Sequence, residues 1–352
     1  MMSHVTGTYA DVYAWPNLVL AYRKAARGKR SHPPAAAFEF RLEENLIHLH
    51  DDLAGGNYRP GPYVNFKIRE PKQRIISAAP FRDRVVHHAL VQVIEPAFEA
   101  SFIGHSYANR VGKGTHRAID TCQAWLQRYR YVLPCDIRQF FPAIDHQILQ
   151  GILGRRIPDA EIRWLIGLIL ESGRGILAEE YAMQYFPGDD LFAVNRPRGL
   201  PIGNLTSQFW ANCYLNEFDK FVTRELGCRA YLRYVDDFLL FADDKKTLWD
   251  WRRRLIDRLD RLRLELHEEQ AIVRPTTEGV RFLGFIVFPT HRLLVRRSGL
   301  HYRQHLRQLV MLYHQHRISL DEVTASIQGW INHARYGNTW GLRRAVLREV
   351  RL

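Results

Sequence analysis

Apolar residues in this chain follow two periods, and the change between them predicts helices alternating with short strands. From Tyr9 to Arg27 they recur every three to four residues, as in an amphipathic helix, and a second such segment covers 35–53. Within 231–244, two apolar runs of strand length flank a pair of adjacent acids, Asp236 and Asp237. This stretch therefore predicts a tight hairpin turn that carries two carboxylates.

The remaining pattern predicts a mixture of strands and helices. A hairpin around a proline-containing turn is predicted at Phe66–Ser77, and further strand-like runs lie at 131–136 and 279–289. Helical periodicity marks the segments 80–96, about 115 onward, 146–170, 203–219 after an opening loop, and 248–266. Residues 171–198 form a polar insertion that Gly and Pro interrupt.

The composition of the chain indicates a negatively charged binding partner. The formal net charge is +13 over 352 residues. Such an excess repels itself unless a polyanion neutralises it, so we expect nucleic acid rather than an acidic membrane surface. No apolar run approaches the roughly 20 residues that span a bilayer, and no signal peptide is recognised, so a cytoplasmic location is expected.

The cysteines favour a core role. Cys122, Cys135, Cys213 and Cys228 lack the Cys-x-x-Cys spacing of zinc sites. We interpret them as small buried residues in a reducing cell, with a disulfide or zinc role as the weaker alternative.

A third carboxylate changes the meaning of the acidic turn. An Asp-Asp pair alone often marks a solvated turn. Asp136, however, ends the strand-like run about a hundred residues upstream. Three acids at one place would repel one another, and divalent Mg²⁺, which prefers oxygen ligands, removes that conflict.

Two motifs carry a family resemblance. The segment Asp136-Ile-Arg-Gln-Phe-Phe-Pro-Ala-Ile-Asp145, followed by Tyr234-Val-Asp-Asp237, resembles the palm of a reverse transcriptase. The resemblance covers most of the chain, from about Lys67 to the C-terminus. It implies an α+β right-hand polymerase: an N-terminal helical extension at 1–65, fingers at 66–130, a palm at 131–289 with a fingers insertion at about 146–198, and a small helical thumb at 290–352.

A further motif resembles one branch of that family. Where most reverse transcriptases have Gln-Gly and then Ser-Pro, this chain has Ile202-Gly203 and Ser207-Gln208. This variant is similar to the reverse transcriptases of diversity-generating retroelements, from bacteria or phage. The alternatives are a reverse transcriptase of a group II intron, a retron or an antiviral defence system, or a catalytically silent RNA-binding scaffold.

The resemblance implies cofactors, substrates and partners. Two Mg²⁺ ions, or Mn²⁺ in their place, would be held by Asp136, Asp236, Asp237 and the backbone carbonyl of Ile137. The expected partners are deoxynucleotides, a template RNA with its RNA/cDNA duplex, and a basic oligomeric helical protein, the accessory variability determinant.

Substrate residues follow from the same resemblance. Arg74, then Arg69 or Lys72, would meet the nucleotide triphosphate, although a solvated basic edge strand is the alternative. Phe141 would exclude the 2′-hydroxyl of ribonucleotides, unless it is a core residue. The segment carrying Ile202, Gly203 and Gln208 would lie against the templating base pair and set its tolerance for mismatches.

Basic residues are expected to grip the nucleic acid at two places. One is the Gly- and base-rich segment 106–117, a loop that opens a helix from about 115, with Arg110, Lys113 and Arg117. The other is the segment 291–352, which carries eleven Arg and three acidic residues. The thumb residues named for this role are Arg296, Arg297, Arg303, Arg307, Arg343 and Arg344.

One position departs from the family pattern. The family usually has Lys-Thr where this chain has Gln270-Ala271, and that Lys has been proposed to protonate the leaving pyrophosphate. We therefore expect His267, another Lys or Arg, or water to take that role.

Overall fold

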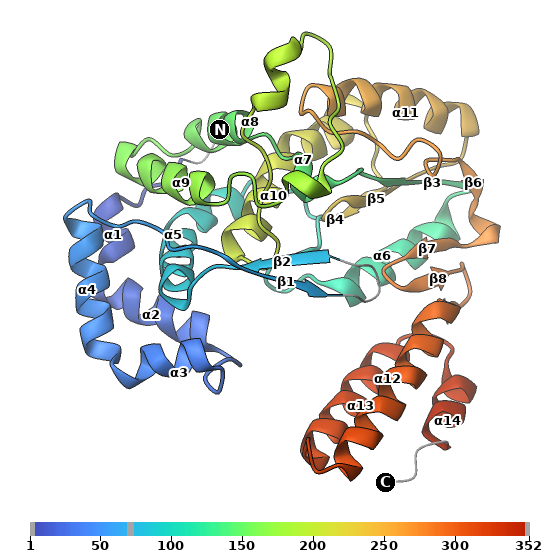
Figure 1. Cartoon of the computed structure of the whole chain (residues 1–352). Helices are drawn as coiled ribbons and strands as arrows, with labels where there is room; N and C mark the ends of the chain where they lie inside the picture. The colour runs from blue at the N-terminus through green and yellow to red at the C-terminus, as the bar shows by residue number, and fades with distance from the viewer. Residues whose placement is uncertain (1–3, 69–73, 349–352) are drawn as a thin grey trace. The chain divides into compact units, whose positions relative to one another are not determined.

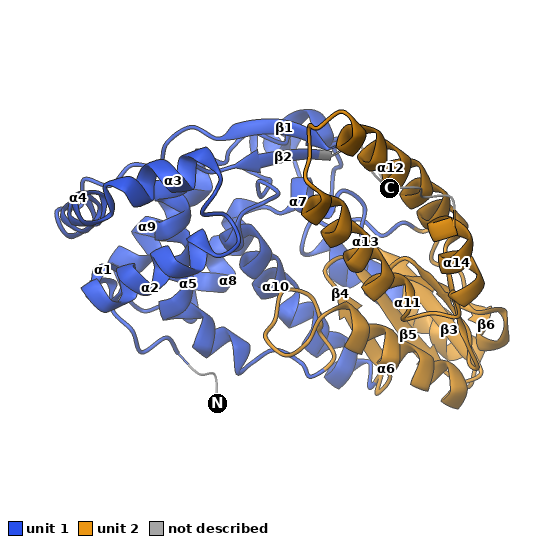
Figure 2. Cartoon of the chain, turned by 90° about the horizontal axis from the view of Figure 1, so that it is seen from below, with its two compact units in different colours: residues 1–104, 137–227, 253–267 blue, residues 105–136, 228–252, 268–352 orange. Residues whose placement is uncertain are grey.

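The computed structural model describes residues 4–68 and 74–348, and the chain divides into two compact units (Figure 2). Unit 1 comprises residues 1–104, 137–227 and 253–267, and unit 2 comprises 105–136, 228–252 and 268–352. The predicted α+β fold of a right-hand polymerase is confirmed by the helices and antiparallel sheets, whose order Figure 1 shows.

Unit 1 is mainly helical. Its elements are α1 (Tyr9–Tyr13), α2 (Trp15–Ala26), α3 (Pro33–Phe40), α4 (Leu42–Ala54), β1 (Val64–Ile68), β2 (Arg74–Ala78), α5 (Phe81–Glu99), α7 (Phe140–Ala143), α8 (His146–Gly154), α9 (Ala160–Ser172), η1 (Ala178–Glu180), η2 (Leu191–Asn195), α10 (Leu205–Lys220) and η3 (Phe221–Glu225). Helices α2 and α10 both pack against α5. The predicted hairpin at Phe66–Ser77 is confirmed by the antiparallel pair β1–β2, with Phe66 opposite Ile76.

Some predicted helices are shorter than expected. The segment 9–27 breaks at Ala14 (φ −53°, ψ 136°), and α2 starts with Pro16 in its first turn, where proline is tolerated. The segment 35–53 breaks at Arg41, whose φ of −121° and ψ of 46° are not helical. The helix predicted at 248–266 is α11 (Lys245–Asp260), and Arg263 beyond it has a φ of 53°.

Unit 2 contains the main sheet, a second small sheet and a helical bundle. Its elements are α6 (Thr115–Arg128), β3 (Tyr131–Asp136), β4 (Tyr231–Tyr234), β5 (Asp237–Ala242), β6 (Arg274–Pro275), η4 (Thr276–Glu278), β7 (Val280–Phe282), β8 (Phe285–Val287), β9 (Arg292–Leu294), α12 (Arg296–His314), α13 (Leu320–Ala334) and α14 (Trp340–Arg348), while α11 crosses the boundary between the units. The main sheet has the order β4-β5-β3-β6, and the small one has the order β7-β8-β9.

Helix α6 joins the two sheets of unit 2 into one core. Its residues Ala118, Ile119, Cys122 and Leu126 recur at helical spacing and are fully or almost fully buried. They pack with Val132, Leu232, Leu239 and Phe241 of the main sheet and with Val280, Phe282, Phe285 and Val287 of the small sheet. All four cysteines of the chain are buried and free, as predicted.

The bundle α12–α14 has its own apolar core. Tyr302 stacks on Trp330 with ring centroids 4.4 Å apart, and Leu306, Val323, Ala334 and Val346 complete the cluster. Arg292 attaches the bundle to α6, because it donates a 2.7 Å hydrogen bond to Asp120 and lies over the ring of Tyr336. Within the described residues, no helix is long and apolar enough to cross a membrane.

Replacing Trp330 with Ala should destabilise this bundle by about 3 kcal/mol, because the change leaves a cavity beside Tyr302. Hydrogen exchange of the α12–α14 amides measures the loss. Trp340→Ala is the matched control, since Trp340 is 67% exposed. Equal loss of protection in both variants would contradict the assignment of Trp330 to the core.

Candidate active site

Two carboxylates lie opposite each other in the main sheet of unit 2. Strands β3 and β5 are antiparallel, and the last residue of β3, Asp136, pairs with the first residue of β5, Asp237. Side chains of directly opposed residues extend from the same face of a sheet with their Cβ atoms about 5 Å apart. Two acids about a hundred residues apart in the sequence therefore lie next to each other in the sheet.

The third acid lies in the loop that joins β4 to β5. Tyr234 pairs with Asp237, so Val235 and Asp236 form a two-residue hairpin loop. Val235 has a φ of 60°, a region that a β-branched residue rarely adopts. The predicted hairpin turn is thus confirmed, with strain at its first loop residue.

Two contacts hold this loop in place. The side chain of Arg233 is fully buried, and its Nη1 donates a 3.0 Å hydrogen bond to the carbonyl of Val235. The hydroxyl of Tyr234 lies 3.1 Å from the hydroxyl of Thr115, the first residue of α6. The conformation of the acidic loop is therefore fixed from β4 and from α6.

The acids repel one another. Burial, and then the charges of Asp136 and Asp236, raise the pKa of the Asp237 carboxyl well above its usual value. Close carboxylate oxygens with this conflict are a donor set that a hard divalent cation relieves. Of the residues that the structure describes, however, no three His, Cys, Asp or Glu side chains form a group that could hold a metal ion.

A metal at this place would thus depend on few protein ligands. Mg²⁺ is commonly held by one or two carboxylates, with waters and substrate phosphates supplying the rest. Asp136 and Asp237 fit that requirement. Ligation by Asp236 and by the carbonyl of Ile137, whose backbone pairs with Leu266 in an isolated bridge, stays a prediction.

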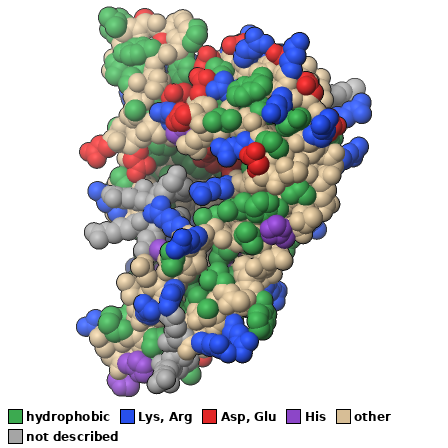
Figure 3. Space-filling view, turned by 90° about the vertical axis from the view of Figure 1, so that its right-hand side faces the viewer, with side chains coloured by type: hydrophobic (Ala, Val, Ile, Leu, Met, Phe, Trp, Pro, Cys, Tyr) green, Lys and Arg blue, Asp and Glu red, His purple; other side chains and the backbone are tan. Residues whose placement is uncertain are grey.

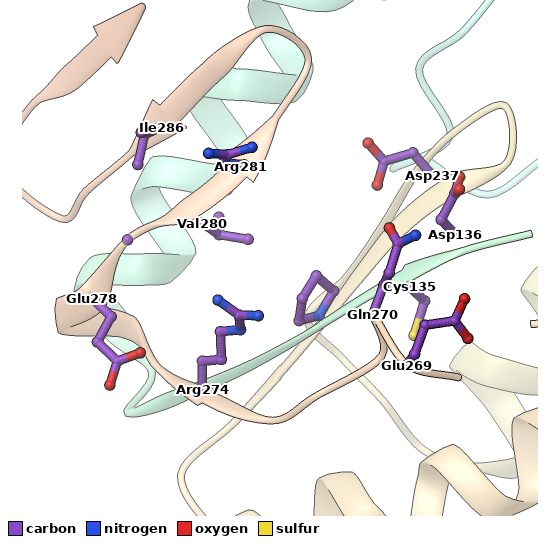
Figure 4. A pocket seen from close by; sticks show the side chains of 12 residues that line it. Cys135, Asp136, Asp237, Glu269, Gln270, Arg274, Glu278, Val280, Arg281 and Ile286 are labelled. Carbon is purple, nitrogen blue, oxygen red and sulfur yellow. The ribbon is translucent and has the colours of Figure 1, made fainter. Parts of the chain in front are cut away.

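A pocket of about 580 Å³ opens beside the acid pair. Figure 4 shows Asp136, Asp237 and Gln270 on one side of it and Arg281, which belongs to β7, on the other side. The position at which the family pattern is broken, Gln270, thus lines the same pocket as the acids. Arg274 and Arg281 are the cations among its described lining residues.

The sequence reasoning missed Arg233 and Arg281. Arg233 interrupts the apolar run of β4, where a charged residue is normally taken as exposed. Arg281 could have been found, because it lies between Val280 and Phe282, both buried, and strand alternation turns it away from their side. The pocket itself could not be predicted, because its lining residues come from several separate segments of the sequence.

The described residues that are expected to meet the nucleotide, Arg74 and Phe141, lie in unit 1. Arg69 and Lys72 fall outside the described residues, and Arg74 opens β2 with its backbone opposite Ile68. Phe141 is half-buried, whereas its neighbour Phe140 is 2% exposed and belongs to the core. The role of Phe141 at the sugar stays a prediction.

The expected base-pair segment is built on β2. The carbonyl of Ile202 accepts a hydrogen bond from the Ser77 amide at 2.9 Å, and Gly203 has a φ of 112°. A Cβ at Gly203 would lie 2.9 Å from Ile76, so glycine is required there. The amide of Gln208 donates to the carbonyl of Asn204 at 3.3 Å, a bond that proline could not make.

The basic residues of unit 2 have different surroundings. Arg110 donates a 2.8 Å hydrogen bond to the carbonyl of Ser106, and Lys113 lies over the ring of Tyr107. Arg117 is exposed, as are Arg296, Arg297, Arg307 and Arg344, while Arg303 and Arg343 are half-buried. Figure 3 shows Lys and Arg side chains spread over the face that it displays. Contact of these residues with nucleic acid stays a prediction.

The Asp237→Asn variant should be more stable than the parent when divalent metal is absent. Its charge is unfavourable in the folded state, so the gain should be near zero at pH 4 and grow as pH rises from the ordinary carboxyl pKa of about 4 towards the raised pKa of Asp237. Thermal melts from pH 4 to 8 in a chelator measure it.

The control for this variant is Asp244→Asn. Hydrogen bonds from Thr247 lower the pKa of Asp244, so the charge of Asp244 stabilises the fold. Asp244→Asn should therefore be less stable than the parent. Added Mg²⁺ should stabilise the parent more than Asp237→Asn. A lower melting temperature for metal-free Asp237→Asn would refute the electrostatic account.

Comparison with known proteins places the chain in a family. Residues 67–287 match the family model described as reverse transcriptase (RNA-dependent DNA polymerase). Protein YkfC of Escherichia coli is 26% identical over 80% of this chain and 81% of its own length. The group II intron-encoded protein LtrA of Lactococcus lactis is 23% identical over 73% of this chain and 52% of its own length.

Among solved structures, apo telomerase from Candida tropicalis aligns with a TM-score of 0.47 and 13% identity, over 67% of this chain and 55% of that one. The family model alone covers more than half of the chain. The chain therefore belongs to the reverse transcriptase family, and its relatives include group II intron-encoded proteins.

Proposed function

We propose that this chain is an active RNA-directed DNA polymerase. The observation that carries the proposal is the pairing of Asp136 with Asp237 across β3 and β5, with Asp236 in the adjoining loop. A silent RNA-binding scaffold has no use for mutually repelling carboxylates, which cost stability unless a cation offsets them.

The protein contributes position and charge to this reaction. Asp136, Asp237 and Asp236 would hold two Mg²⁺ ions, or Mn²⁺ in their place, with the carbonyl of Ile137 as a further ligand. When bound, such ions lower the pKa of the primer 3′-hydroxyl and neutralise the pyrophosphate that leaves. Arg233 and the Tyr234–Thr115 contact keep the acids in place before any ligand arrives.

Cations near the acids have a separate role in this proposal. Arg281 lines the same pocket as Asp136, Asp237 and Gln270. Its guanidinium stays charged at any working pH, so it supplies electrostatic stabilisation and no proton. Proton donation to the pyrophosphate is accordingly left to water or to His267.

Substrate and partner assignments follow the family resemblance. Arg69, Lys72 and Arg74 would bind the triphosphate, and Phe141 would reject ribonucleotides. The loop before α6 and the exposed arginines of α12 and α14 would bind template RNA and its duplex with cDNA, through shape and phosphate charge. The fingers, palm and thumb would be the segments 66–130, 131–289 and 290–352.

We further propose that the enzyme serves a diversity-generating retroelement, in bacteria or phage. The support is Ile202-Gly203 with Ser207-Gln208, where Gln208 adds a backbone donor and a side-chain amide to the first turns of α10. An adenine-mutagenised cDNA would be the product, and a basic accessory variability determinant would be the partner.

A group II intron is the second candidate source. The similarity to LtrA, named as a group II intron-encoded protein, favours it. This chain spans 52% of LtrA, so the activity of the whole relative does not transfer by itself. Sequencing the RNA that copurifies with the protein distinguishes an intron from a template repeat.

Replacing Asp136 with Asn should lower primer extension on an RNA template by at least about a thousandfold, because the charge that holds the metals is lost. RNA affinity should change less than about twofold, since it depends on cations elsewhere. Asp243→Asn is the control. Asp243 follows the last residue of β5, at the end of the strand opposite to Asp237, and accepts a hydrogen bond from the Arg130 amide. Extension by Asp136→Asn at the control rate would rule the proposal out.

Replacing Gln208 with Pro should change the misincorporation spectrum opposite template adenine. The variant loses the backbone hydrogen bond from residue 208 to Asn204 near the start of α10, and the proline ring adds a clash with that carbonyl, at a cost of up to about 3 kcal/mol. Sequencing of cDNA from a defined template measures the spectrum, and Gln208→Ala separates the side-chain effect from the backbone effect. Identical spectra for the parent and both variants would remove this position from fidelity control.

A further inference from the structure

A second pocket, of about 270 Å³, lies within unit 1 where α2, α5 and the start of α10 meet. Among its described lining residues, four are cationic and none is acidic: Lys24, Arg27, Lys29 and Arg84. His87 and His88 of α5 and Gln208 of α10 also line it. So dense a positive charge is unfavourable unless an anion enters.

The cations of this pocket are not neutralised by neighbouring acids. None of the four forms an ion pair of 4.0 Å or less with any described carboxylate, although Glu95 lies close enough to interact with Lys24. Burial and the charge of Arg84 lower the pKa of Lys29. Burial, with Lys24 and Lys29, lowers the pKa of His88 to about 4. The cations thus lie close enough to act on one another and on His88.

The floor of the pocket holds an unsatisfied polar group. His87 is 2% exposed, and its Nδ1 has no hydrogen-bond partner. Burial lowers the pKa of His87 to about 3, so the ring is neutral and one of its nitrogens carries a proton. A buried polar atom without a partner is costly.

The start of α10 adds to the positive potential. Asn204, the N-cap residue, makes no side-chain capping bond, because its Oδ1 accepts a hydrogen bond from the Ala79 amide instead. Its Nδ2 donates to the carbonyls of Ser77 and Pro201. The first amides of this 16-residue helix thus lack a side-chain acceptor. Such a helix terminus attracts phosphate.

We propose that this pocket binds a backbone phosphate of a single-stranded RNA, held by Lys24, Arg27, Lys29 and Arg84 and by the start of α10. Four cations around a pocket of about 270 Å³ suit an anionic group such as a phosphate. No described acid lines it to accept the Mg²⁺ that accompanies a triphosphate. The RNA identity of the strand rests on the proposed function.

The test measures binding without catalysis. The full chain, without divalent metal or nucleotide, is titrated into a fluorescent unstructured 25-nucleotide RNA at several salt concentrations. The variant Arg27→Ala/Lys29→Ala removes two exposed cations of the pocket. The control Arg23→Ala/Arg30→Ala removes the same charge from exposed positions of the same segment that do not line it.

The pocket variant should bind this RNA about tenfold more weakly than the control variant, as expected for the loss of one charged contact. Its salt slope should be shallower by about 0.7 for the one phosphate released. Gln208→Glu, which places a carboxylate in the pocket, should also weaken binding, whereas the isosteric Gln208→Met should have a smaller effect. Thermal melts of each variant verify that the fold is retained.

Two results would overturn the inference. One is equal RNA affinity of the pocket and control variants. The other is that the pocket variant binds dATP more weakly in the presence of Mg²⁺ while its RNA affinity is unchanged. The pocket would then be a nucleotide site. Primer extension by the parent chain is scored separately, so a failed polymerase proposal and a failed pocket proposal give different results.

Discussion

The repulsion between Asp136 and Asp237 is the constraint on which the site depends. The register of β3 and β5 forces the two carboxylates to the same face of the sheet, so neither can move away without breaking strand pairing. Their charge is tolerated because the sheet around them is held by buried apolar side chains such as Leu133, Leu239 and Leu240. A stable core thus supports an unfavourable local arrangement, which is common at functional sites.

Helix α6 is the structural element that makes this arrangement possible. One face of it packs on the strands that carry the acids, and the same face packs on the small sheet that carries Arg281. Its first residue, Thr115, contacts Tyr234, and its exposed Asp120 pairs with Arg292 at the base of α12–α14. Helix α6 therefore contacts the acidic loop, the sheets that line the pocket and the attachment point of the bundle.

Much of the acidic site's geometry was predictable from the sequence, because the acids lie in contiguous motifs. Asp136 at the end of an apolar run, and Asp236 and Asp237 between two runs, were enough to predict a hairpin and a convergence of charge. The helix breaks at Ala14 and Arg41 were not predictable, since apolar periodicity continues across both positions.

Features that depend on tertiary packing could not be predicted from the sequence either. The burial of Arg233 contradicts the usual preference of its residue type and is understood only from its bond to Val235. The basic pocket of unit 1 combines Lys24, His87 and Gln208, which lie far apart in the sequence. No single segment contains enough of that pocket to indicate it.

The positive φ of Val235 has a consequence for the stability of the folded chain. A β-branched residue in that conformation costs about 1–2 kcal/mol, and this cost is met when the chain folds. Because Arg233 donates a hydrogen bond to the carbonyl of Val235, the hairpin is held in its strained form without any ligand. The chain thus carries a permanent loss of stability that keeps its acidic loop in one conformation.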